Sequence, residues 1–225
     1  MTERPFRDAA RSHDSLTARV EKATLIWLAR HTPPWINSDH LTALGLLSML
    51  GAGLSYWYAA VNPVALLAVI GFLALNWLGD SLDGTLARVR NRLRPRYGFY
   101  VDHIVDAFGA VFLFGGMGLS GFMNPAVAAC LLIAYLVLMI DVFLATYTLG
   151  TFEISFWKFG PTELRILLAI GNIALYARGP FANLGGARFL LFDVGGVIGT
   201  AGITLVLLIS VIRHTRALYR LETLP

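Results

Sequence analysis

Four aspartates within one stretch of 27 residues are the strongest chemical feature of this sequence. Asp80 and Asp83 are three residues apart, and Asp102 and Asp106 are four residues apart. On an α-helix, side chains at these spacings lie on the same face. The segment from Arg88 to Tyr97 that connects the two pairs is short enough to make their helices antiparallel neighbours. We therefore expect the four carboxylates to face one another near one end of a helix bundle.

Four ionised carboxylates in one pocket repel one another and need cations nearby to stay charged. Two divalent metal ions bridged by these oxygens would remove the repulsion, and hard carboxylate ligands select Mg²⁺, Mn²⁺ or Ca²⁺. A pair of metal ions held in this way stabilises both the attacking and the leaving oxygen at a phosphoryl centre. The pattern indicates phosphoryl-group chemistry.

Small residues and an arginine follow the first pair of acids. Gly84 and Ala87 would let a flat or phosphorylated ligand approach the backbone, and Arg88 can offer a bidentate fork to phosphate. The alternative is that the acids only pair with the five arginines nearby, Arg88, Arg90, Arg92, Arg94 and Arg96. Simple charge pairing with arginines does not require the two acids of each pair to lie on the same face of their helix. The observed spacing therefore favours metal binding.

The same residues resemble the signature of a known enzyme family. Residues 80–88 read D-S-L-D-G-T-L-A-R, and residues 98–106 read G-F-Y-V-D-H-I-V-D. This is similar to D-x-x-D-G-x-x-A-R followed by G-x-x-x-D-x-x-x-D in the CDP-alcohol phosphotransferase family, and all eight signature positions match. The resemblance implies that an alcohol attacks the β-phosphorus of a CDP-linked donor, that CMP leaves, and that a phosphodiester forms.

The resemblance also implies a role for each signature residue. The ligands of two Mg²⁺ or Mn²⁺ ions correspond to Asp80, Asp83, Asp102 and Asp106. Asp106 also corresponds to the residue that takes the proton of the attacking hydroxyl. The contacts of the CDP group correspond to Asp80, Gly84, Ala87 and Arg88, and relatives often place a polar residue near the nucleotide where this chain has Thr42.

Further residues are candidate contacts for the acceptor or for phosphate: Gly98, His103, Arg94, Arg96, Lys158, Glu163 and Arg165. His103 follows Asp102 as in the choline/ethanolamine phosphotransferase branch, but a histidine there can also simply pack against nearby backbone. Glu163 and Arg165 open a helix whose N-terminus can hold an anionic group, or they form structural ion pairs. Asp141 has the same two interpretations.

The elements that position these residues are membrane helices. Only 14% of the 225 residues are charged and 56% are hydrophobic, whereas soluble domains carry about 25% charged residues. No charged residue occurs from His40 to Gly79 or from Ala107 to Ile140. About 20 apolar residues cross the hydrocarbon core, so each stretch holds two spans. A soluble domain and a disordered chain are excluded, and a single cysteine excludes a disulfide scaffold.

An Asn-Pro turn signal divides each uncharged stretch, at Asn62-Pro63 and at Asn124-Pro125. The fold class is therefore all-α integral membrane with six transmembrane helices. Their predicted ranges are 40–61, 63–87, 98–121, 125–149, about 161–177 and 194–212. One catalytic domain covers residues 38–213, between an N-terminal segment 1–37 and a tail 214–225.

Sixteen of the eighteen Lys and Arg residues fall on the side of the two termini, and only Arg178 and Arg188 fall opposite. The positive-inside rule then places both termini in the cytoplasm and the aspartates near the cytoplasmic end of the bundle, in an active site that faces the cytoplasm. The expected location is the cytoplasmic membrane of a bacterium. The arginines between residues 88 and 96 are expected to meet anionic lipid headgroups rather than nucleic acid.

Residues 15–31 predict an amphipathic helix in the membrane interface, with an apolar face made by Leu16, Val20, Thr24 and Trp27. Glycines along the spans would let helices approach closely, within one chain or in the seam of the homodimer that we expect.

The predicted function is transfer of a phosphatidyl group from CDP-diacylglycerol to a small polar alcohol or alcohol phosphate. The alternative is transfer of a CDP-linked amino alcohol to diacylglycerol. An intramembrane prenyltransferase also uses Asp-rich motifs with Mg²⁺, but it carries them on widely separated helices. An ion-coupled transporter would predict internal repeats, and the sequence shows no such symmetry.

Overall fold

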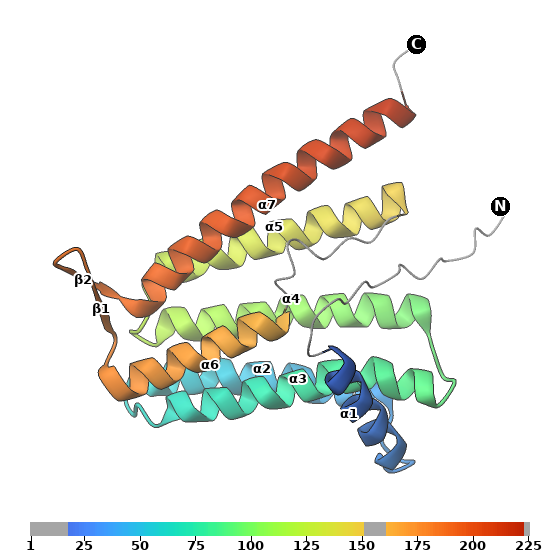
Figure 1. Ribbon diagram of the computed structural model, residues 1–225, viewed down its shortest axis with the longest axis horizontal. Helices are drawn as coiled ribbons and strands as arrows, with labels where there is room; N and C mark the ends of the chain where they lie inside the picture. Colours follow the sequence, from blue (N-terminus) through green and yellow to red (C-terminus); the bar gives the residue numbers. More distant parts are fainter. Residues whose placement is uncertain (1–17, 151–160, 223–225) are drawn as a thin grey trace.

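The computed structural model describes residues 18–150 and 161–222, which form seven helices and one β-hairpin (Figure 1). The helices are α1 Ala18–His31, α2 Ser38–Ala59, α3 Ala65–Val89, α4 Pro95–Leu119, α5 Pro125–Leu149, α6 Pro161–Arg178 and α7 Leu191–Leu221. Among the described residues, α3, α4, α5 and α7 are long and apolar enough to cross a membrane. The helical integral membrane class is confirmed. A helix overlaps each of the six predicted spans, but α2 and α6 are not among these four.

The two predicted Asn-Pro breaks lie between helices, one between α2 and α3 and the other between α4 and α5. The Asn62 side chain accepts a hydrogen bond from the Val64 N–H in the turn before α3. The Asn124 side chain accepts one from the Ala126 N–H, and Pro125 is the first residue of α5. Proline is favoured at this position because the first helical N–H has no partner within the helix.

Helix α2 packs against both α3 and α4. A Cβ added to Gly116 of α4 would lie 2.2 Å from the Gly53 carbonyl oxygen of α2. A Cβ on Gly79 of α3 would lie 2.7 Å from the Leu41 carbonyl oxygen. These glycines let α2 approach both partners backbone to backbone. They account for one correction: α3 and α4 run antiparallel as predicted (Figure 1), but each packs on α2, and they are not the direct neighbours that the short connection predicted.

Helix α1 packs on α3 through a side that the sequence analysis did not predict. Leu25 and Ala29 are buried in a cluster with Leu82 and Leu86 of α3. Trp27, on the predicted apolar face, is 59% exposed and points away from this contact. The helix is therefore attached to the protein next to the first pair of acids, and its outward face stays the predicted membrane-interface face.

A β-hairpin connects α6 to α7, and the sequence analysis missed it by predicting helices alone. Strand β1 is Phe181–Leu184, strand β2 is Ala187–Leu190, and the two pair antiparallel. Gly185 and Gly186 form the two-residue turn with φ values of 58° and 87°. Positive φ at both turn residues favours Gly-Gly, which is the sequence signal for this hairpin. The hairpin and the α3–α4 connection lie at opposite ends of the molecule (Figure 1).

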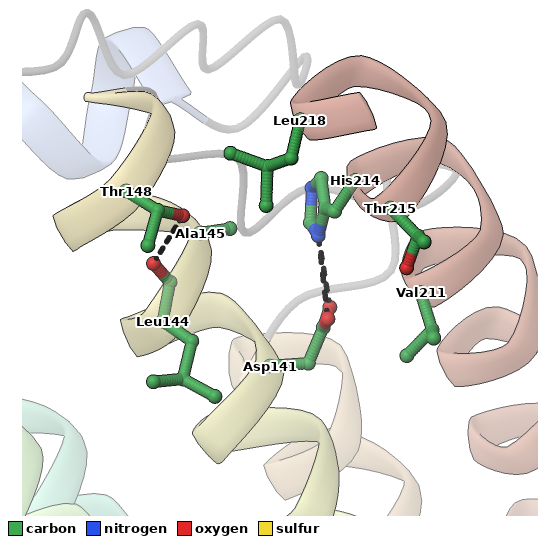
Figure 2. Close-up of a pocket in the computed structure, with 8 residues that line it drawn as sticks. All are labelled: Asp141, Leu144, Ala145, Thr148, Val211, His214, Thr215 and Leu218. Atoms are coloured by element: carbon green, nitrogen blue, oxygen red, sulfur yellow. Dashed lines mark hydrogen bonds and ion pairs between the residues drawn. The ribbon is translucent and has the colours of Figure 1, made fainter. Parts of the chain in front are cut away.

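Helix α7 continues to Leu221, so the predicted tail boundary at residue 214 lies inside a continuous helix. A polar group holds this helix to α5. Ser210 Oγ donates to Asp141 Oδ2 at 2.5 Å, and His214 Nδ1 lies 3.3 Å from the same carboxylate. Figure 2 shows Asp141 and His214 pointing toward each other from the two helices, beside a cavity of about 250 Å³. Asp141 therefore joins two helices, and its partners belong to α7 rather than to the signature motifs.

Candidate active site

The carboxylate of Asp83 is fixed by the first turns of α2. Thr42 Oγ1 donates to Asp83 Oδ2 at 2.8 Å, and the Gly84 N–H donates to Oδ1 at 2.5 Å. Ser38 Oγ also donates to the Asp83 carbonyl oxygen at 2.9 Å. Asp83 is buried, and these donors make up for the water it has lost. The structure thus brings Thr42, predicted from the sequence as a nucleotide contact, onto a predicted metal ligand.

Asp80 is paired with a basic residue from α6. Arg165 Nη2 donates to Asp80 Oδ2 at 2.9 Å, while Arg165 Nε donates to Asn76 Oδ1, also at 2.9 Å. Asn76 in turn donates from Nδ2 to the Gly45 carbonyl oxygen of α2. The Arg165 side chain is only 16% exposed, whereas that of Asp80 is 43% exposed. A chain of polar contacts therefore runs from α2 through α3 to α6 and ends on the carboxylate of Asp80.

The two acids of α4 lie within electrostatic reach of the two acids of α3. Asp106 experiences the charges of Asp80, Asp83 and Asp102, together with the opposite charge of Arg165. Asp83 likewise experiences the charges of Asp102 and Asp80. Both pairs lie in the halves of α3 and α4 next to the connection between the two helices, and the meeting of the four carboxylates in one pocket stays a prediction. As they stand, no three His, Cys, Asp or Glu side chains in the described ranges form a group that could hold a metal ion.

Comparison with known families decides the class of this protein. The family described as CDP-alcohol phosphatidyltransferase matches residues 35–213, most of the chain. The chain belongs to the CDP-alcohol phosphatidyltransferase family. Its members are transferases of phosphate-containing groups in phospholipid synthesis, so the protein is an enzyme of that kind. A comparison with curated proteins finds no match.

The phosphatidyltransferase family generally depends on divalent metal ions, and the residues at this site fit such ions. The four acids supply hard carboxylate oxygens, which are the donors that Mg²⁺ and Mn²⁺ prefer. Two of the acids come from α3 and two from α4, and their charges act on one another. The basic group bound to Asp80 comes from α6. The donor set therefore suits divalent metal ions.

The arginines of the α3–α4 connection bear on the alternative that the acids only pair with them. Arg90 donates to the carbonyl oxygens of Thr32 at 2.7 Å and Pro33 at 3.0 Å, and also to that of Ile36. Arg94 forms an ion pair with Asp39 and lies over the ring of Tyr97. These two arginines thus fix the α1–α2 linker and the start of α2. Asp80, the first signature acid, instead pairs with Arg165, from a different helix.

The remaining signature residues border open space. The guanidinium of Arg88 lies near Gly84, where an added Cβ would be 3.4 Å from Arg88 Nη2. No atom lies within 4 Å of a Cβ added to Gly98, so this face of α4 is open one turn before Asp102. Ala87 is partly buried, and Arg88 and Arg96 are exposed.

His103 lies on the side of α4 that faces α5. Its Nδ1 contacts the Phe99 carbonyl oxygen of its own helix, and its ring packs edge-on against Phe143 at 4.8 Å between centroids. Glu163 is partly buried in the first turn of α6. Lys158, the other predicted contact from this part of the chain, lies outside the described residues.

Sequence reasoning missed Asn76 and Ser38 at this site. Asn76 precedes Asp80 by one helical turn and is a polar residue inside an uncharged stretch, so its position carried a usable signal. Ser38 carried no such signal, because its contact is with a backbone carbonyl 45 residues away.

Proposed function

We propose that this enzyme transfers a phosphatidyl group from CDP-diacylglycerol to a small polar alcohol or alcohol phosphate and releases CMP. One observation carries the proposal: in a chain of the CDP-alcohol phosphatidyltransferase family, the four signature acids lie in the halves of the antiparallel helices α3 and α4 that flank their short connection. Four acids in such proximity are costly to maintain in a membrane protein and are a hallmark of a functional site.

In this proposal two Mg²⁺ or Mn²⁺ ions are held by Asp80, Asp83, Asp102 and Asp106. When bound, the ions supply positive charge to the phosphate oxygens and to the attacking and leaving oxygens. Thr42 and the Gly84 N–H hold the Asp83 carboxylate in one orientation. Asp83 therefore needs little reorganisation when the site is loaded.

Asp106 is the proposed general base. The residue is accessible in the structure, so a substrate can reach it. The acceptor hydroxyl gives its proton to the Asp106 carboxylate while its oxygen bonds to the β-phosphorus of the donor. The bond from that phosphorus to the bridging oxygen breaks, and CMP leaves with the bond's electron pair. Arg88, Gly84 and Ala87 are the proposed contacts of the CDP group.

The proposed membrane arrangement has six spans, with α2 and α6 crossing beside the four long apolar helices, and both termini in the cytoplasm. The sidedness of the fold supports this arrangement. The α3–α4 connection and the C-terminal end of α7, both rich in arginine, lie at one end, and the hairpin lies at the other (Figure 1). We place the enzyme in the cytoplasmic membrane of a bacterium, as a homodimer.

The test is to incubate the purified full chain with Mg²⁺ or Mn²⁺, CDP-diacylglycerol and a panel of alcohols and alcohol phosphates, and to measure CMP. We expect CMP release that depends on both the metal and one acceptor. CMP formed only from CDP-choline or CDP-ethanolamine with diacylglycerol would establish the amino-alcohol transferase instead. A folded protein that yields no CMP with any pair would refute both reactions.

A further inference from the structure

Arg165 is a cation paired with a carboxylate that the proposed function assigns to a metal ion. Its Nη2 donates to Asp80 Oδ2, an oxygen of a proposed metal ligand. Its charge also acts on Asp106, the proposed base and metal ligand on α4. A guanidinium keeps its charge under all conditions found in proteins and cannot withdraw by losing a proton. In the structure, Arg165 therefore stands where a divalent cation would have to act.

The second anchor of Arg165 does not involve any acid. Nε donates to Asn76 Oδ1 at 2.9 Å. Asn76 is buried, and its Nδ2 is held by the Gly45 carbonyl oxygen at 3.1 Å, which fixes the direction of Oδ1. This part of the α2–α3 interface is closely packed, because Gly79 and Gly45 allow a backbone-to-backbone approach there. A change on Asp80 would leave this anchor intact.

We propose that Arg165 is the counter-ion of the unloaded site and that it exchanges with a divalent metal ion on Asp80. Before metal binding, the guanidinium neutralises Asp80. On metal binding, Nη2 leaves Asp80, while the Nε–Asn76 hydrogen bond keeps the guanidinium beside the site. The released N–H groups then face the anionic oxygens of the substrates. The inference rests on the proposed function for the identity of the metal ligands, and it makes Asn76 a positioning residue for Arg165.

If Arg165 and the metal ion compete for the Asp80 carboxylate, the affinity for metal should rise when Arg165 is removed. Removing a catalytic-site residue normally weakens the site, but removing Arg165 frees Asp80 and should strengthen metal binding. We expect Arg165→Gln to lower the Kd for Mn²⁺ by about tenfold, the scale of a charge-assisted hydrogen bond. Turnover of the same variant should fall. Arg165→Lys keeps the charge and loses the fork to Asn76, and its Kd should stay within about threefold of wild type.

The experiment measures Mn²⁺ binding to the purified full chain by calorimetry and by the loss of the free-ion paramagnetic resonance signal, with no nucleotide or lipid substrate present. Arg88→Gln is the matched control, because it removes a nearby guanidinium that lies by Gly84. An equal gain in affinity for Arg88→Gln and Arg165→Gln would mean that only the general positive field matters, and the exchange would be overturned.

The remaining outcomes separate this inference from the proposed function. An unchanged Mn²⁺ affinity in Arg165→Gln, with wild type binding the ion, overturns the exchange and leaves the metal centre intact. Absence of Mn²⁺ binding in wild type and in all three arginine variants overturns the metal centre and the exchange with it. Asn76→Leu should raise the KM for the anionic substrate while Mn²⁺ still binds. An unchanged KM overturns the positioning role of Asn76.

Discussion

Thr42 of α2 donates a hydrogen bond of 2.8 Å to Asp83 of α3, linking the start of one helix to a carboxylate near the end of the next. Because Asp83 is only 8% exposed, no water can easily replace this donor. Thr42→Val keeps the shape of the side chain and removes the hydrogen bond. We expect kcat/KM for CMP release to fall about tenfold or more, on the scale of an unsatisfied buried acceptor.

Two variants frame that measurement. Thr42→Ser retains the hydroxyl and should retain most of the activity. Thr146→Val makes the same chemical change on α5, where the hydroxyl bonds only to the Val142 carbonyl oxygen of its own helix, and it should be silent. Wild-type kcat/KM in Thr42→Val would show that Asp83 does not depend on this donor.

The proposed base can be tested by removing its charge. Asp106→Asn keeps the size of the side chain but cannot take a proton, and we expect kcat to fall by about 100-fold or more. The melting temperature should not fall, because the neutral asparagine no longer meets the repulsion of Asp80, Asp83 and Asp102. Asp193→Asn is the control, since this acid lies at the hairpin end and bonds to the Asn124 N–H. Near-normal turnover in Asp106→Asn would assign the base elsewhere.

Neighbouring glycines of α4 give a matched test of the close approach to α2. In Gly116→Ala, the new methyl group would lie 2.2 Å from a backbone oxygen of Gly53, so the helices must separate. We expect a loss of about 1–3 kcal/mol in unfolding free energy, the usual cost of overpacking. Gly115→Ala meets no atom within 4 Å and should be neutral. Denaturant unfolding in detergent compares the two, and equal stabilities would contradict the packing described.

The Asp141 group should contribute to stability and not to chemistry. Ser210→Ala removes the donor to Asp141 and should cost about 1 kcal/mol, within the range of interhelical hydrogen bonds in membranes. Turnover per folded molecule should be unchanged. Thr200→Ala, whose hydroxyl bonds to the Gly196 carbonyl oxygen of its own helix, is the control. A loss of turnover in Ser210→Ala without loss of folded protein would give Asp141 a catalytic part.

The helix positions could be predicted because length and apolar content determine them directly. Helix α5 runs from Pro125 to Leu149 as predicted, between an Asn-Pro turn and a glycine with φ of 68°. The helix positions of the signature acids were also predictable, because residues three or four apart lie on the same face of a helix. The ion ligands, the base and the acceptor contacts stay predictions.

Contacts between distant segments were beyond the sequence. Arg165 pairs with an acid 85 residues away, and that pairing depends on α6 packing against α3. The side of α1 that packs on the protein was predicted wrongly for a similar reason. A periodic pattern shows which face of a helix is more apolar, but it does not show which other helix will pack against it. Leu25 and Ala29 meet α3, whereas the more apolar-looking Trp27 faces outward.

The hairpin between α6 and α7 also has a practical consequence. Its Gly185-Gly186 tip is at the end of the molecule farthest from the α3–α4 connection, and both neighbouring strands are short and largely exposed (Figure 1). Exposed loop tips tolerate insertions best. A small rigid protein grafted at this tip would enlarge a 24.6 kDa particle enough for image alignment in electron microscopy. Metal-loaded and metal-free forms could then be compared in the same lipid environment.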